Sequence, residues 1–116
     1  MINRAAIDIL RDLDETGSME LVRQLVGSFV QAADGNLVRL TTALAQGDAK
    51  TLVQVAHALK SSAANLGAEA LSACYRELEK AGRESRIDDA RALLERTRNE
   101  QQRALLQLRE LLAEAG

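Results

Sequence analysis

The single histidine of the chain is the residue whose type and position suggest chemistry. His57 lies in the segment Ala56-His57-Ala58-Leu59-Lys60-Ser61-Ser62. A neutral imidazole is a competent nucleophile near neutral pH, and a lysine ammonium can offset negative charge on a transferred group. Lys60 and Ser61 follow at i+3 and i+4, the spacings that bring helical side chains together, so we expect Lys60 to be exposed beside the histidine. The pattern favours a functional histidine with a nearby cation; the alternative is an ordinary solvated surface histidine.

Helical rotation predicts that this histidine points outward. At about 100° per residue, six apolar side chains gather on one core face, and His57 lies roughly 150° from the centre of that face. These core-face residues are Leu52, Val55, Ala56, Leu59, Ala63 and Leu66. Small residues flank the imidazole, so the active site of a partner could close over it. We expect Val53, Ser61 and Ala64 to be the close contacts of such a partner.

A second segment carries a polar stripe of four residues at helical spacing: Ser72, Arg76, Glu79 and Arg83. We interpret Ser72 and Arg76 as part of a solvated helix face. For Glu79 and Arg83 two readings stay open: a surface pair at i, i+4, or a contribution to the site around His57.

The elements that position these residues are expected to be helices. The 116 residues contain no proline and only two aromatic side chains, and 47% are apolar, mostly Ala and Leu. Apolar periodicity predicts helices near 3–14, 18–33, 36–46, 48–66, 68–81 and 88–113. The expected helix ends lie near five glycines, and the expected caps at four polar residues: Gly17, Gly35, Gly47, Gly67 and Gly82, with Ser18, Asn36, Asp48 and Asp88. We predict one all-α domain over 1–116, an antiparallel up-down four-helix bundle with a short additional N-terminal helix.

Composition and missing motifs exclude several classes. The formal charge of −2 without basic clusters argues against nucleic acid, and no apolar stretch is long enough to span a membrane. The start Met1-Ile2-Asn3-Arg4 is unlike a signal peptide, and the one cysteine, Cys74, is expected to be a buried, inert thiol in a cytoplasmic protein. Phosphate-loop, kinase and zinc motifs are absent, so we expect no cofactor and no autonomous kinase activity. Polar outer faces make a monomer the expected state.

The residues around the histidine resemble the histidine-containing phosphotransfer (HPt) family. Its pattern is roughly Ala-His-x-Leu-Lys-Gly-Ser-x-x-x-Leu-Gly, followed by a leucine-rich helix. The matching residues are Ala56, His57, Leu59, Lys60, Ser62, Leu66, Gly67 and Ala68, then Leu71, Cys74, Leu78 and Glu79. Ser61 stands where the family usually has glycine; serine is small and can donate a hydrogen bond to phosphate.

The resemblance implies roles for individual residues. His57 would accept the phosphoryl group on its distal ring nitrogen, and Lys60 would offset the negative charge of that group. Glu79 would hold the proximal nitrogen, and Arg83 would attract an acidic partner.

The resemblance also implies the partners. They would be receiver domains that bring an aspartate, Mg²⁺ and a lysine, so that the chain relays a phosphoryl group from a hybrid sensor kinase to a response regulator. The alternative is a non-catalytic helical adaptor or dimerisation module that uses the apolar seam of the last helix, Ala90 to Leu111. Thr97 and Gln101 interrupt that seam, which weakens this reading.

Overall fold

The described part of the structure, a computed structural model, comprises residues 2–13 and 19–114. Within it the chain forms five helices: α1 (Arg4–Asp12), α2 (Glu20–Gln46), α3 (Ala49–Asn65), α4 (Glu69–Arg83) and α5 (Ile87–Glu114). No strand occurs in these residues; one isolated antiparallel bridge joins Ile2 to Ala68. The predicted all-α class is therefore confirmed.

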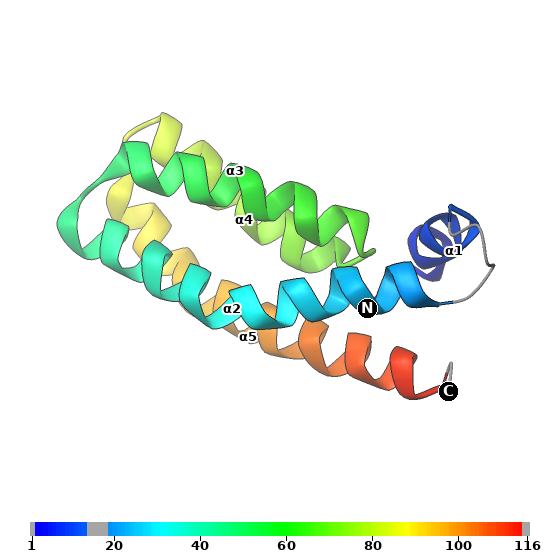
Figure 1. Ribbon diagram of the computed structural model, residues 1–116. Coiled ribbons are helices and arrows are strands. Elements are labelled where there is room, and N and C mark those ends of the chain that lie inside the picture. Colours follow the sequence, from blue (N-terminus) through cyan, green and yellow to red (C-terminus); the bar gives the residue numbers. More distant parts are fainter. Residues whose placement is uncertain (1, 14–18, 115–116) are drawn as a thin grey trace.

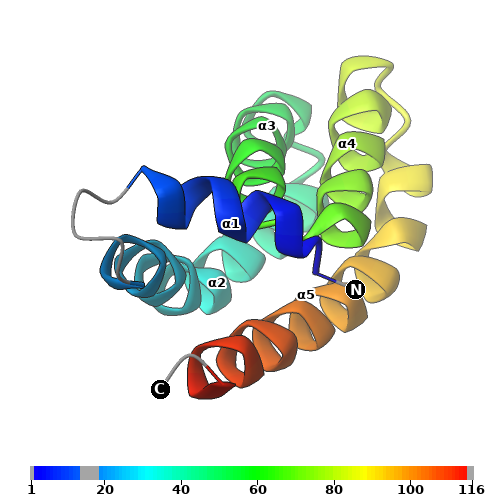
Figure 2. The same cartoon turned by 90° about the vertical axis from the view of Figure 1, so that its right-hand side faces the viewer.

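The four longer helices run alternately up and down the length of the molecule, and α1 lies across one end (Figures 1 and 2). The α3–α4 pair forms the most extensive interface, and α5 packs on α4 and α2. The short α1 contacts α2 and the nearby end of α3. None of the helices in the described residues is long and apolar enough to cross a membrane.

The core fills the centre of this arrangement with leucine, valine and alanine. All six residues of the predicted core face of α3, from Leu52 to Leu66, are buried. They meet Leu40 and Leu44 from α2, and Leu78 from α4. Full burial of one such leucine stabilises the fold by roughly 1.5–3 kcal/mol, so this apolar stripe fixes which side of α3 faces inward.

The glycine and cap predictions were correct at some positions and wrong at others. Gly47 and Gly67 adopt positive φ values of 68° and 76° just after α2 and at the α3–α4 turn, where glycine is favoured. Asp48 caps α3, because its side chain accepts a hydrogen bond from the Thr51 amide at 3.0 Å. Asp88 is not a cap but lies in the first turn of α5. Gly17 and Ser18 lie outside the described residues.

The predicted helix end at Gly35 was wrong, because α2 continues through Gly35 and Asn36. Glycine inside a helix costs only about 1 kcal/mol relative to alanine. Buried side chains on both sides of Gly35, including Phe29 and Leu40, follow a single helical phase, and their packing outweighs that cost.

An N-terminal contact fixes the turn that follows α3. The Asn3 amide donates to the Gly67 carbonyl at 2.7 Å, and the Asn3 side-chain amide donates to Glu69 Oε1 at 2.6 Å. A Cβ atom at Gly67 would overlap the Asn3 carbonyl oxygen. This glycine therefore serves both the left-handed turn and the close approach of the N-terminal segment.

Two further contacts set the distance between α3 and α4. At one end, a Cβ atom on Gly82 would lie 2.8 Å from Val53 Cγ2, so the missing side chain lets the helices approach closely. Further along, Ser72 is buried and its hydroxyl donates to the Lys60 carbonyl at 3.0 Å. The stretch of α3 that contains His57 lies between these contacts and is held firmly against α4.

Candidate functional site

His57 occupies the middle of α3 and faces solvent. Its side chain is 60% exposed, whereas Ala56 before it and Leu59 two residues after it are buried. The apolar stripe causes this orientation, because turning His57 inward would bring the whole core face of α3 to the surface. The imidazole is therefore exposed to a partner while its backbone is held by the core.

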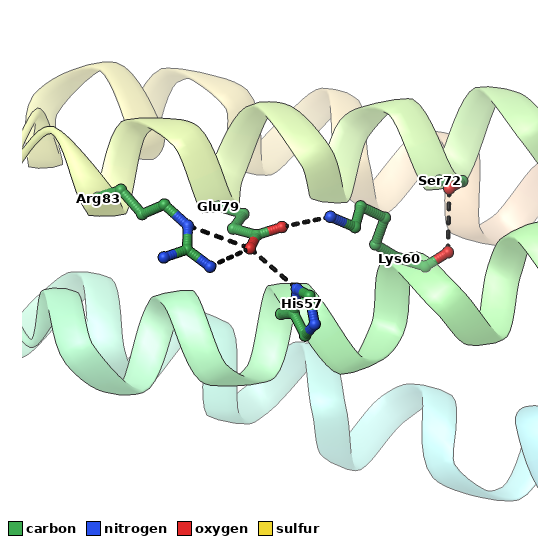
Figure 3. A network of polar contacts seen from close by, with 5 residues as sticks. All are labelled: His57, Lys60, Ser72, Glu79 and Arg83. Carbon is green, nitrogen blue, oxygen red and sulfur yellow. Dashed lines mark hydrogen bonds and ion pairs between the residues drawn. The ribbon is translucent and has the colours of Figure 1, made fainter.

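One carboxylate from α4 joins the polar side chains around the imidazole. Glu79 Oε2 lies 2.9 Å from His57 Nδ1, and Glu79 Oε1 accepts from Lys60 Nζ at 2.7 Å (Figure 3). Arg83, one turn further along α4, donates to Oε2 through Nη2 at 2.7 Å and Nε at 3.2 Å. The Glu79 side chain is only 7% exposed, so these contacts replace most of its hydration.

The surrounding donors keep this buried carboxylate ionised. The hydrogen bond from Lys60 is the main cause that lowers the pKa of Glu79 to about 2; burial opposes it, and the hydrogen bonds from Arg83 and His57 reinforce it. At neutral pH Glu79 thus carries a full negative charge.

The ionised carboxylate selects one tautomer of the neutral imidazole. A carboxylate can only accept hydrogen bonds, so His57 Nδ1 must carry the proton in its contact with Glu79. The lone pair of the neutral ring is then on Nε2. In Figure 3 this second ring nitrogen points away from Glu79, and the His57 side chain as a whole is 60% exposed.

The predicted partner contacts differ in their accessibility. Ser61 and Ala64 are exposed on the face of α3 that carries His57. Val53 is only half-buried rather than open, because it packs against α4 at Gly82. A partner could therefore reach His57 more easily over Ser61 and Ala64 than over Val53.

Two expectations about this region were wrong. Lys60 was expected to be exposed, yet its side chain is only 27% exposed and binds Glu79. Ser72 was assigned to a solvated face, yet it is buried and bonds the Lys60 carbonyl. Arg76 is exposed as expected. The burial of Ser72 could have been inferred from its seven-residue spacing from Glu79, because that spacing puts both residues on the side of α4 that meets α3.

Other features lie apart from this cluster. Cys74 is buried as predicted, and burial raises the pKa of its thiol. A mainly apolar groove of about 330 Å³ lies between α1, α2 and α3, and its lining includes Leu25, Phe29 and Ser62 but none of the residues around Glu79. In residues 2–13 and 19–114, no group of three or more His, Cys, Asp or Glu side chains is arranged to hold a metal ion.

Comparison with known proteins gives one family and one similar structure. The sequence-family model of the Hpt domain matches residues 24–116. A search of curated proteins gives no match. Among solved structures, the chain is similar to the crystal structure of histidine-containing phosphotransfer protein B (HptB) from Pseudomonas aeruginosa PAO1. The TM-score is 0.84 and the sequence identity 28%, over 94% of this chain and 91% of that chain.

Proposed function

Because the chain belongs to the Hpt domain family, and so acts in histidine phosphotransfer within two-component phosphorelays, we propose that His57 is its phospho-accepting residue. The observation that carries this assignment is that His57 is the only histidine in all 116 residues. Its exposure and the contact between its Nδ1 and Glu79 support the same conclusion.

The proposed reaction uses Nε2 as the nucleophile. The Nε2 lone pair attacks the phosphorus of an aspartyl phosphate, so that an N–P bond forms while the P–O bond to the aspartate breaks. The aspartate carboxylate leaves with the electron pair. The proton stays on Nδ1, where Glu79 accepts its hydrogen bond and stabilises the positive charge that develops on the ring. The reverse sequence returns the phosphoryl group to a second aspartate.

Glu79, Lys60 and Arg83 act as a unit in this proposal. Glu79 orients the ring, while Lys60 and Arg83 keep Glu79 ionised and add positive charge near the imidazole. Phosphoryl transfer depends mainly on in-line positioning and charge neutralisation. This chain contributes the fixed imidazole and nearby cations.

The family implies that the partners are receiver domains of phosphorelay components. We further propose that the donor is the receiver domain of a hybrid sensor kinase and the acceptor a response regulator. Each partner would supply the reacting aspartate and Mg²⁺. Ser61 and Ala64 would form the close contacts beside His57, since both are exposed.

Transfer from a receiver domain carrying radioactive phosphate tests the assignment. The wild-type chain should acquire an acid-labile label, and His57→Gln should acquire none while it keeps its helical circular dichroism and melting temperature. A matched control combines His57→Gln with Gln102→His, which moves a histidine to an exposed position on α5. This double variant should stay unlabelled, because the new ring has no Glu79 beside it. Label on His57→Gln would refute the assignment, and a wild-type chain that binds receivers without acquiring label would favour the adaptor alternative.

A further inference from the structure

We propose that the Ser61 hydroxyl donates a hydrogen bond to the phosphoryl group on His57 Nε2 and thereby stabilises the phosphorylated form of the chain. The inference rests on the proposed function of His57 and gives Ser61 a positioning role. It rests on the direction of Nε2, the lean of the Ser61 side chain and the free hydrogen-bonding capacity of its hydroxyl.

Nε2 and Ser61 lie on the same side of the histidine. Viewed down α3 at about 100° per residue, Ser61 is rotated by about 40° to one side of His57 and Lys60 by about 60° to the other. Lys60 marks the side that faces α4, because it binds Glu79. Nε2 points away from Glu79 (Figure 3), so a phosphoryl group bonded to it would extend towards the Ser61 side.

The Ser61 side chain also leans towards the histidine. In an α-helix the Cα–Cβ bonds tilt towards the N-terminus, so a side chain covers the turn that precedes its own Cα. For Ser61 that turn is the one that carries His57. Residues at i and i+4 have Cβ atoms about 5–6 Å apart, a gap that a phosphoryl group on the imidazole can bridge.

The hydroxyl of Ser61 is free to donate a hydrogen bond, unlike the hydroxyls of three other helical residues. Thr41, Ser62 and Thr97 each donate to the carbonyl four residues earlier, at 2.8, 3.2 and 2.9 Å. Within the residues that the structure describes, Ser61 makes no such bond and is exposed. On the α4 side, by contrast, the Lys60 ammonium and the Arg83 guanidinium already bind Glu79.

The test is the equilibrium distribution of the phosphoryl group between the full chain and one receiver domain. A change that affects only docking alters the forward and reverse rates equally and leaves this distribution unchanged. A bond to the phosphoryl group, in contrast, changes the distribution, because it exists only in the phosphorylated chain. The ratio therefore separates the proposed role from a steric or docking role.

Removing the hydroxyl with Ser61→Ala should shift the ratio towards the receiver by roughly two- to tenfold, the value of one net hydrogen bond. Ser62→Ala, the matched control, removes a hydroxyl that already bonds the Ala58 carbonyl and should leave the ratio unchanged. Ser61→Gly, which restores the usual family residue, should shift the ratio as Ser61→Ala does, whatever it does to the rates. Alanine favours helix, so Ser61→Ala is expected to stay folded.

If the equilibrium ratio for Ser61→Ala equals that of the wild type, the proposal is overturned. An equal shift for Ser62→Ala would overturn it as well. Neither result affects the assignment of His57, which is judged by whether His57→Gln acquires label. The two proposals therefore fail separately.

Discussion

Replacing Glu79 with glutamine should remove stability in a pH-dependent way. The pKa of Glu79 is lowered from 4.5 to about 2, chiefly by the hydrogen bond from Lys60, so the folded state favours the ionised form. A lowered folded-state pKa contributes stability that is fully present above the unfolded value, near pH 4.5, and is lost as the pH falls towards 2. Glutamine cannot ionise, so Glu79→Gln should lack this contribution at every pH.

The size of the effect follows from the pKa and from the exposure of the partners. A carboxyl with a pKa of about 2 instead of 4.5 contributes about 3 kcal/mol when ionised. The side chains of Lys60 and Arg83 are 27% and 60% exposed, and solvent screens their attraction to Glu79. We therefore expect Glu79→Gln to lower the free energy of unfolding at pH 7 by about 1–3 kcal/mol.

Urea unfolding followed by circular dichroism between pH 7 and pH 2.5 measures this difference. The gap between wild type and Glu79→Gln should be constant from pH 7 to about 5 and should shrink below pH 4.5. Glu77→Gln is the matched control, because Glu77 lies two residues away on α4 and forms an exposed pair with Arg96 at 3.0 Å. It should cost less than about 1 kcal/mol at pH 7. A gap for Glu79→Gln that stays unchanged down to pH 2.5 would refute the reasoning.

Three further predictions concern nearby parts of the fold. Lys60→Met should slow phosphoryl transfer and also lower the free energy of unfolding by about 1–2 kcal/mol, because it removes a donor from a buried carboxylate; urea unfolding at wild-type stability would contradict this. Gly67→Ala should cost at least about 1–2 kcal/mol through its positive φ and the overlap with Asn3, whereas Gly27→Ala, with nothing within 4 Å, should stabilise by up to about 1 kcal/mol; thermal melts that show equal effects would count against the turn geometry. Cys74 should react with a thiol reagent only as the chain unfolds, and rapid labelling of the native protein would disprove its burial.

Local pattern was enough to predict the helix that carries the site. The core face of α3 and the outward direction of His57 follow from side-chain type and a rotation of about 100° per residue, and both were correct. The same logic placed Asp48 as a cap and Gly47 after α2. It was wrong at Gly35, where tertiary packing on both sides outweighs a local preference.

Contacts between helices were harder to predict, because they depend on how closely and at what angle two helices meet. The approach of α4 to α3 is set by Gly82 against Val53 and by Ser72 on the Lys60 carbonyl. Helical periodicity identified the polar stripe of α4 but not which of its members would be buried. The link between Lys60 and Glu79 therefore became visible only in three dimensions.

The two cations that bind Glu79 affect the local charge by which a partner could distinguish the unphosphorylated chain from the phosphorylated one. With a neutral imidazole, Lys60, Arg83 and Glu79 leave a local excess of one positive charge on a chain whose overall charge is −2. A phosphoryl group adds close to two negative charges, as phosphorylation does on other side chains. If His57 is the phospho-accepting residue, as we propose, this small area changes sign on phosphorylation. It would attract acidic surfaces in the unphosphorylated chain and basic ones in the phosphorylated chain, so the phosphoryl group itself would bias whether a partner stays bound.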